Sequence, residues 1–576
     1  MDPAGKPGTS ALRVPPEILA DILCYHQRLC HSYTSWHTAR PSFSWITVTH
    51  VCRYWREVAL GTPHLWTRIN ISAPETKLSP STLPRMIERT KLFLIRSNRL
   101  PLDVYDSTIS TSVSNPILLR LVLPQIGRAR SLHIALTTAF RRLLDEYSSI
   151  STPLLTSLGV SLSRGGDATF ARFKAPNLQE LIVFPCVERC GRPNWISAPF
   201  MFPVSLTRLV LHASTFPQQP APTIAHYIQH LVSLQYLVLM DVLHSFPSPR
   251  SDAPTHPLPM ILPRLKEVHI STNTITCASF LRRIGHPAST RVWLRLDKYS
   301  IGSTLPHAQF QPFLRERLLP TSPDAPSIDT LVLGCQLVAF HTGGRELGGQ
   351  FSTNSRLPMR FLLSFTDPEP THPLISAFIS LVRAVILTTP LTEITILSVH
   401  SLGADLSDWL ALTEVLPGVT TLAFYHYPQN RGRQNTGWDT GKMLTFLQPQ
   451  CQSSSAPGVE HRTTALNLPH LTRIHLTNID FDVNAGHEHR SSGPSFVDDL
   501  RTTLAARLEA GCAAVGALII ERCGNVDDSV VGRLKEFIDA VEWDGYEGPL
   551  EKAGDGLMED GDVNRVYEKG YLETIW

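Results

Sequence analysis

No excess of one charge marks this sequence. Its 576 residues include 52 Lys and Arg against 50 Asp and Glu, a formal net charge of +2. A chain this close to neutrality has no field of one sign that could attract nucleic acid or an anionic membrane over its whole surface. We therefore predict no nucleic acid and no membrane among its partners.

Long hydrophobic runs are also missing. The most apolar window, residues 373–391, is interrupted by Arg383 and Pro390, and the N-terminal stretch has no apolar core of signal-peptide length. A helix that spans a membrane needs about 20 apolar residues with few charges, and an export signal needs a shorter apolar core. We expect the protein in the cytoplasm, the nucleus or both.

Patterns of metal ligands are absent as well. The ten cysteines have no regular spacing, which is typical of reduced, mostly buried thiols. The Cys24–His37 and Cys186–Cys190 groups lack the two closely spaced ligand pairs that a tetrahedral zinc site takes from a short segment. His487 and His489 have no third ligand at helical spacing. We predict no metal site.

Catalytic motifs are missing too. The glycine-rich segment 342–350 lacks the lysine and the hydroxyl that phosphate binding with Mg²⁺ requires. The sequence contains neither a G-x-S-x-G elbow nor an H-E-x-x-H helix. We predict a protein that is not an enzyme, with no catalytic residue and no cofactor. An enzyme of unrecognised type would need a polar cluster with perturbed pKa values, which a sequence does not reveal.

What the sequence does have is a dense aromatic and apolar stretch at residues 45–72. A helical pattern places one apolar stripe on a single face, made by Val48, Val51, Cys52, Trp55 and Val58. Residues 61–63 end this helix, after which Leu65 and Trp66 can fold back. We predict that a small domain core is formed by Val48, Val51, Cys52, Trp55, Leu65 and Trp66.

A short helix is predicted before this stretch. Prolines are tolerated at a helix N-terminus, and the apolar residues that follow Pro15 and Pro16 cover one broad side: Ile18, Leu19, Ile22 and Leu23. Units this small usually need a partner or a larger neighbour to be stable.

Three motifs in this region follow one another in a defined order: Val14-Pro15-Pro16-Glu17-Ile18-Leu19, then Val51-Cys52-Arg53-Tyr54-Trp55-Arg56, then Pro63-His64-Leu65-Trp66. Over about residues 12–72 they resemble the F-box, and the whole chain resembles the large fungal-type F-box family. The resemblance implies docking on the Skp adaptor of a cullin-RING ubiquitin ligase through an apolar helical surface. The adaptor-binding residues expected from it are Pro15, Pro16, Ile18, Leu19, Ile22 and Leu23. The alternative is a helical cap that only covers the end of a larger fold.

The remaining chain carries a repeat. Segments of the form L-x-x-L-x-L begin at Leu178, Leu206, Leu234 and Leu265, and related strands are expected at residues 131–135, 292–296, 361–365, 393–397 and 517–521. Return helices are predicted at residues 223–231, 375–386, 496–511 and 528–541. Strands that alternate with helices at this short period favour an irregular leucine-rich-repeat solenoid with a curved parallel sheet. The fold class is α/β, with a small helical F-box in front.

Long insertions rich in Pro, Gly, Ser and Gln are predicted at residues 297–325, 335–358 and 425–463. Such loops are often functional, and the last one has residue types that are enriched in binding hot spots. A possible target-binding loop therefore includes Tyr425, Tyr427, Arg431, Arg433 and Trp438. A solvated loop with incidental aromatics explains the same residues equally well.

The predicted domains are a disordered tail (1–11), the F-box-like domain (12–72), the solenoid with its loops (73–545) and an acidic flexible tail (546–576). The resemblance predicts the substrate-recognition subunit of a Skp-cullin-F-box (SCF) ligase, with a Skp-type adaptor, through it a cullin, and an unknown protein substrate as partners. The alternative function is a leucine-rich scaffold with an F-box-like cap and no ligase role.

Overall fold

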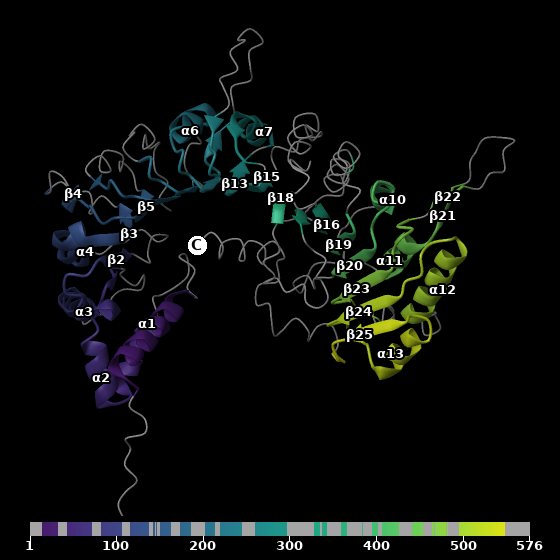
Figure 1. Ribbon diagram of the computed structural model, residues 1–576, viewed down its shortest axis with the longest axis horizontal. Helices are drawn as coiled ribbons and strands as arrows, with labels where there is room; N and C mark the ends of the chain where they lie inside the picture. The colour runs from purple at the N-terminus through teal and green to yellow at the C-terminus, as the bar shows by residue number, and fades with distance from the viewer. Residues whose placement is uncertain are drawn as a thin grey trace, which may run out of the picture. The chain divides into compact units, whose positions relative to one another are not determined.

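The fold is described from a computed structural model (Figure 1). The structure describes residues 14–32, 43–71, 82–105, 116–136, 142–143, 146, 150–162, 173–185, 202–212, 219–244, 260–272, 274–287, 289–296, 328–334, 337–342, 359–365, 383, 394–400, 406–425, 440–452, 463–465, 467–479, 481 and 495–547. The chain divides into two compact units. The first comprises Met1–His244 with Met260–Leu265, and the second comprises Ser245–Pro259 with Lys266–Ile575.

The first unit begins with short helices and continues as alternating strands and helices. Its elements are α1 (Pro16–Ser32), η2 (Phe43–His50), α2 (Arg53–Leu60), η3 (Pro63–Trp66), β1 (Arg68–Asn70), α3 (Thr82–Arg96), β2 (Leu102–Tyr105), α4 (Pro116–Val122), η4 (Leu123–Arg128), β3 (Ala129–Leu136), β4 (Ile150–Ser151), β5 (Ser157–Leu162), β6 (Phe173–Lys174), β7 (Glu180–Pro185), β8 (Arg208–His212), β9 (Gln219–Pro220), α6 (Ala221–Ile228), β10 (Tyr236–Met240), β11 (Leu243–His244) and β12 (Met260–Ile261).

The main strands of the first unit pair in parallel and in chain order, β1–β2–β3–β5–β7–β8–β10. Neighbouring turns are also joined outside the strands, because the Thr207 N–H donates to the Gln179 carbonyl at 2.8 Å and the Gln235 N–H donates to the Thr207 carbonyl at 2.7 Å. Figure 1 shows α3 and α4 following one another beside β2 and β3. The predicted parallel sheet with interleaved helices is confirmed in this unit.

The second unit consists of β13 (Glu267–Thr272), α7 (Thr274–Arg283), β14 (Ile284–Gly285), β15 (Arg291–Leu296), β16 (Ile328–Gly334), β17 (Leu337–Thr342), β18 (Met359–Phe365), β19 (Ile396–His400), α10 (Leu406–Thr413), β20 (Thr421–Tyr425), α11 (Thr440–Leu447), β21 (Gln450–Gln452), β22 (Thr463–Ala465), β23 (Arg473–Thr477), α12 (Phe496–Glu509), β24 (Ala517–Glu521), α13 (Asp528–Lys535) and β25 (Ala540–Trp543).

Most strands of the second unit are also parallel, with one local exception. β13, β15 and β18 pair in parallel, and so do β16, β19, β20, β23, β24 and β25. Between these two runs, β17 pairs antiparallel with both β18 and β16. Figure 1 shows α11, α12 and α13 following one another beside β23, β24 and β25.

The leucine pattern forms the core of the repeats. The positions that recur in the L-x-x-L-x-L segments are all buried: Leu178, Leu181, Val183, Leu206, Leu209, Leu211, Leu234, Leu237, Leu239, Leu265, Val268 and Ile270. In each segment the first of these positions precedes the strand and the other two belong to it. Alternating residues of a strand face opposite sides of a sheet, so this spacing directs the same side of every strand into the interior.

Three local predictions need correction. The segment 335–358 contains strand β17, because its apolar residues pair with both neighbouring strands. The segment 425–463 contains α11 and the pair β21–β22. The helix expected at residues 528–541 ends at Lys535, and its last part forms β25 at the edge of the sheet. The insertion 297–325 lies outside the described residues, as does all but Arg383 of the helix at 375–386.

A buried histidine in β3 depends on a glycine in β5. His133 and Gly159 are partners in the parallel register, and a Cβ added to Gly159 would lie 2.2 Å from the imidazole Nδ1. The ring therefore occupies space that only glycine leaves open. Burial, together with the charge of Arg68, lowers the pKa of His133 to about 4 from its ordinary value of 6.5.

We predict that His133 makes stability depend on pH. In the unfolded chain the His133 imidazole is protonated below about pH 6.5, whereas in the folded chain it is protonated only below about pH 4. The contribution of His133 to the free energy of unfolding is therefore complete above pH 6.5 and decreases as the pH falls from 6.5 to 4. The loss at this site is about 3 kcal/mol. Urea unfolding from pH 7 to pH 4 should therefore show a shallower pH slope for His133→Gln than for wild type. Identical slopes would contradict a buried neutral imidazole.

A buried arginine in the second unit forms hydrogen bonds that join neighbouring turns. Arg507 on α12 is fully buried, and its guanidinium donates to the carbonyls of Leu447 at 3.0 Å, Asn467 at 2.8 Å and Leu468 at 2.7 Å. The Asn467 amide donates to the carbonyls of Phe446 and Gln448, both at 3.4 Å. Desolvation lowers the pKa of Arg507, and these carbonyls stabilise its charge.

Replacing this arginine should weaken the second unit. In Arg507→Met the side-chain volume is nearly kept but the three carbonyls lose their donor, which should cost about 2–4 kcal/mol. Hydrogen exchange in α11 and α12 measures this loss locally. Arg501→Met is the matched control, because Arg501 lies on the same helix and is mostly exposed. An equal effect of both variants would show that the buried bonds contribute nothing.

Candidate interaction surface

The N-terminal region 14–71 folds as a small helical domain that continues into β1. α1 begins at Pro16, and the Leu19 N–H donates to the Pro15 carbonyl at 2.9 Å, so the prolines occupy the first turn where no helical donor is lost. Two long-range bonds fix α1 against the rest of the domain. The Gln27 amide donates to the Leu65 carbonyl at 2.7 Å, and the Tyr54 hydroxyl donates to the Val14 carbonyl at 2.6 Å.

The core of this domain differs from the predicted one. Leu65 and Trp66 are buried as expected, and so are four residues that were not predicted to belong to the core: Leu19, Leu23, Trp45 and Ala59. The indole N–H of Trp66 donates to the Ala59 carbonyl at 3.0 Å. Val48 and Trp55 are only half-buried.

Val51 and Cys52 are not core residues. Val51 is 61% exposed, and Cys52 is exposed at the N-cap of α2, where its sulfur accepts from the Trp55 N–H at 3.5 Å. The predicted single helix across residues 48–58 is wrong, because η2 ends at His50 and α2 begins at Arg53. The break rotates the second half of the stripe away from the first.

Three aromatic rings join the small domain to the first repeat. Trp45, Trp66 and Phe93 meet edge to face, with ring centroids 5.3 Å apart for Trp45–Trp66, 5.1 Å for Trp66–Phe93 and 6.2 Å for Trp45–Phe93. Phe93 belongs to α3, which follows β1. This geometry is favourable for aromatic pairs, so the domain and the repeat share one core.

The exposed face of α1 carries an apolar stripe. Ile18, Ile22 and Tyr25 are 52%, 47% and 63% exposed, and their spacing of four and three residues places them on one face of the helix. Pro15 and Pro16 are exposed beside them. We call Ile18, Ile22 and Tyr25 the α1 stripe. Contiguous exposed apolar side chains indicate an interaction site more often than single ones do.

The structure corrects the predicted adaptor-binding flank. Leu19 and Leu23 are 0% and 2% exposed because they face the domain core, so they cannot contact a partner directly. Tyr25 was missed, although it continues the pattern three residues after Ile22. Residues 18, 19, 22 and 23 span a broad sector of about 140° on the helix, and the sequence does not say which edge of this sector faces inward.

The predicted target-binding loop is only partly described. Tyr425 is the last residue of β20 and is buried, with its ring centroid 5.7 Å from that of His475. It is therefore a sheet residue rather than a loop anchor. Tyr427, Arg431, Arg433 and Trp438 lie outside the described residues.

No group of three metal-binding side chains is found among the residues that the structure describes. Within the same residues, no helix is long and apolar enough to cross a membrane. The cysteines whose side chains the structure describes are free thiols: Cys24, Cys52, Cys277, Cys512 and Cys523.

Comparison with known proteins identifies the N-terminal domain. Residues 11–72 match the F-box-like family, which confirms the resemblance expected from the three motifs. No curated protein matches the chain. A similar solved structure is that of the leucine-rich repeat-containing protein LegL7 from Legionella pneumophila, at 13% sequence identity, with 73% of this chain and 95% of that chain covered and a TM-score of 0.26.

We predict that Trp66 stabilises the small domain more than Trp55 does. Trp66→Ala removes the ring that contacts Trp45 and Phe93, which should cost about 3–5 kcal/mol, whereas Trp55→Ala should cost clearly less because Trp55 is half-buried. Hydrogen exchange in α1, α2 and α3 measures both. A larger loss of protection in Trp55→Ala than in Trp66→Ala would contradict the shared aromatic core.

Proposed function

We propose that this protein is the substrate-recognition subunit of an SCF-type E3 ubiquitin ligase. In this proposal residues 12–72 dock on a Skp-type adaptor and through it a cullin, and the strand–helix repeats within residues 73–545 bind the protein to be ubiquitinated. The α1 stripe is the observation that carries the proposal, because it is a bare apolar surface on the domain that matches the F-box-like family. The resemblance of the whole chain to fungal-type F-box proteins remains a prediction.

In this proposal the α1 stripe is buried against the adaptor in the complex. Burying an apolar side chain of this size is worth about 1.5–3 kcal/mol relative to leaving it in water, and an amphipathic helix that lies in an apolar groove is a common mode of recognition. The buried edge of α1, with Leu19 and Leu23, holds the helix on its own domain. The two faces of α1 therefore have separate tasks, one structural and one available for a partner.

Such a subunit needs no chemistry of its own. Holding a target next to a ubiquitin donor converts an encounter between free molecules into an effectively intramolecular one, which raises the effective concentration of the target lysine. The proposed complex would act in the cytoplasm or the nucleus.

The second candidate function is a scaffold that binds partners without a ligase. The fusion of the F-box-like domain to the first repeat through Trp66 and Phe93 favours it, because that contact is what a cap on a repeat array provides. The two candidates differ in whether the α1 stripe binds an adaptor.

We predict that Ile18→Asp with Ile22→Asp strongly weakens adaptor binding without unfolding the domain. Both residues are about half exposed, whereas a carboxylate placed in an apolar interface costs several times the thermal energy. In a pull-down with purified Skp-type adaptor, the affinity should decrease by at least about tenfold. Leu19 is unsuitable for this test because it is buried.

The matched control is Val204→Asp with Val232→Asp. These valines are 66% and 52% exposed on the repeats of the same unit, so the change has the same chemistry at another site. The control should bind the adaptor as wild type does. Unchanged binding by the Ile18/Ile22 variant would exclude the α1 stripe as the docking surface, and absence of binding by wild type would favour the scaffold.

A further inference from the structure

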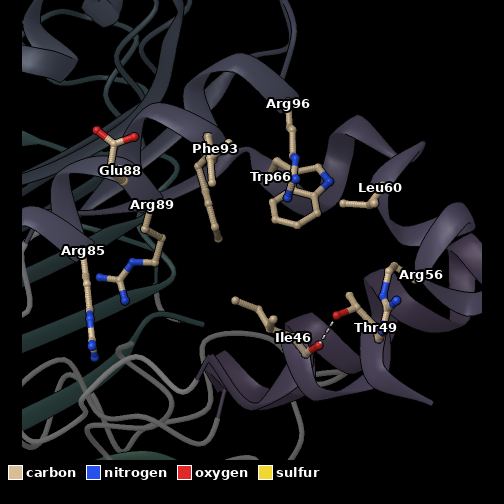
Figure 2. A pocket seen from close by; sticks show the side chains of 11 residues that line it. Ile46, Thr49, Arg56, Leu60, Trp66, Arg85, Glu88, Arg89, Phe93 and Arg96 are labelled. Carbon is tan, nitrogen blue, oxygen red and sulfur yellow. Dashed lines mark hydrogen bonds between the residues drawn. The ribbon is translucent and has the colours of Figure 1, made fainter. Parts of the chain in front are cut away.

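Part of the exposed apolar surface of the first unit lies beside the aromatic core. A pocket where the small domain meets α3 is lined by Leu60 and Leu92 and, from α3, by the arginines Arg85, Arg89 and Arg96 (Figure 2). This surface follows from the contact of the small domain with the first repeat. A second group of exposed apolar residues lies on the repeats, away from that contact.

Four successive strands of the first unit, β5, β7, β8 and β10, are each preceded by the same tight turn. In every turn the N–H of a buried leucine donates to the carbonyl three residues before it: Leu155 to Thr152 at 3.1 Å, Leu178 to Ala175 at 3.3 Å, Leu206 to Pro203 at 2.9 Å and Leu234 to Leu231 at 3.0 Å. The two residues in between are the central residues of a β-turn. They are Pro153-Leu154, Pro176-Asn177, Val204-Ser205 and Val232-Ser233.

These turns are stacked along one edge of the sheet, because parallel strands begin at the same edge. Side chains also bond one turn to the next. The Asn177 amide donates to the Pro153 carbonyl at 2.8 Å, and the Ser205 hydroxyl donates to the Leu178 carbonyl at 2.8 Å. The central residues therefore form a row that runs across the strands, with neighbouring turns about 4.8 Å apart.

The row is apolar and exposed. Leu154, Val204 and Val232 are 45%, 66% and 52% exposed, and Pro153 and Pro176 are exposed as well. We call these five residues the turn ridge.

Turn chemistry explains only part of the turn ridge. Proline is favoured at the first central position of such a turn, which accounts for Pro153 and Pro176. Valine is not among the residues that turns favour, yet Val204 and Val232 occupy the same position in two successive turns. Contiguous exposed apolar side chains indicate an interaction site more often than single ones do.

The geometry of the turn ridge fits a helix. An extended peptide joins a sheet through backbone bonds along an edge strand, whereas the turn ridge crosses the strands. A helix advances about 5.4 Å per turn, which is close to the strand spacing of about 4.8 Å. Apolar side chains on successive turns of one helix therefore meet successive turns of the repeats. Four repeat turns span about 14 Å, the length of about ten helical residues.

Charge indicates what lies beside the apolar stripe of such a helix. The four turns contain no Asp, Glu, Lys or Arg. Two basic residues flank them, Lys174 before the second turn and Arg264 in the corresponding turn before β13. Both are exposed, and neither forms an ion pair within the part of the chain that the structure describes. Glu180, at the start of β7, already pairs with Arg208 at 3.2 Å.

We propose that the turn ridge binds an amphipathic helix of the target protein. This helix has an apolar stripe of about three turns that covers Leu154, Val204 and Val232, with acidic residues beside the stripe that meet Lys174 and Arg264. The inference rests on the proposed function in assigning target binding to the repeats. It requires neither the adaptor nor the α1 stripe.

A displayed library of helical peptides of about 14 residues, about four helical turns, tests this proposal. Each peptide carries leucine at i, i+4, i+7 and i+11, alanine elsewhere, and a random choice of Glu, Gln or Lys beside the leucine stripe. Selection on the full chain should enrich Glu over Lys at these positions, and fluorescence anisotropy gives the affinity of the selected peptide. Absence of any enriched peptide, or enrichment of Lys over Glu, would overturn the proposal.

Variants locate the site. Val204→Ser with Val232→Ser removes apolar surface but introduces a residue that turns favour, so the variant should fold and bind the selected peptide at least about tenfold more weakly. The matched control, Ile18→Ser with Ile22→Ser, makes the same kind of change on the α1 stripe and should bind the peptide as wild type does. Equal weakening in both variants would mean unspecific apolar attraction and would overturn the site.

Two further measurements separate the alternatives. A proline in the middle of the selected peptide should strongly weaken binding because it breaks a helix, and unchanged binding would show that the ligand is extended and refute the helix. The Val204/Val232 variant should still bind a purified Skp-type adaptor. Loss of peptide binding with adaptor binding intact therefore supports the turn ridge, whatever the adaptor experiment shows about the ligase role.

Discussion

The contact of Trp66 with Trp45 and Phe93 is the interaction on which the N-terminal half of this structure depends. About 60 residues bury too little apolar surface to be stable alone, and the small domain has only a few fully buried side chains of its own, such as Leu19, Leu23 and Ala59. Trp66 completes that core from the end of the domain, and Phe93 completes it from α3. The first repeat is therefore part of the domain's stability rather than a separate body behind a linker.

The same contact sets the position of the arginines. With Phe93 and Met86 facing inward, the 3.6-residue period of α3 places Arg85, Arg89 and Arg96 at the edge of the contact, where the helix meets η2 and α2. Because the buried face of α3 fixes the rotation of the helix about its axis, it also fixes the direction of the residues beside that face. The aromatic core thus fixes the orientation of α3, and the buried Leu19 and Leu23 fix which face of α1 carries the α1 stripe.

The features that could be predicted from the sequence are those encoded by residues close to one another in the chain. The strands of the repeats were predictable because the six residues of an L-x-x-L-x-L segment specify both the strand and its buried side. The family of the small domain was predictable from its three motifs, but the residues that form its core were not. Helical spacing alone allowed one continuous helix through Val51 and Cys52, whereas the structure has two helices, one ending at His50 and the next beginning at Arg53. The ring that packs against Trp45 and Trp66 is Phe93, which lies in the next helix, α3, and no local period indicates this contact. Strand β17 was missed because a hairpin inside an array of parallel strands has no counterpart in the repeat pattern.

Buried side chains join neighbouring turns in the second unit through hydrogen bonds to backbone carbonyls. Eight residues after the first leucine of the four segments, the sequence has Cys186, Ser214, Val242 and Asn273. No single residue type is therefore kept at this position, and turns must still satisfy their buried carbonyls. In the second unit Arg507 and Asn467 satisfy the carbonyls of residues 446–448, 467 and 468 from two different elements. A guanidinium has five donors in a rigid plane, so one arginine reaches carbonyls of two turns at once. At this place in the second unit the carbonyls are satisfied by donors from two elements that are distant in sequence, and a motif written in residue types does not detect such an arrangement.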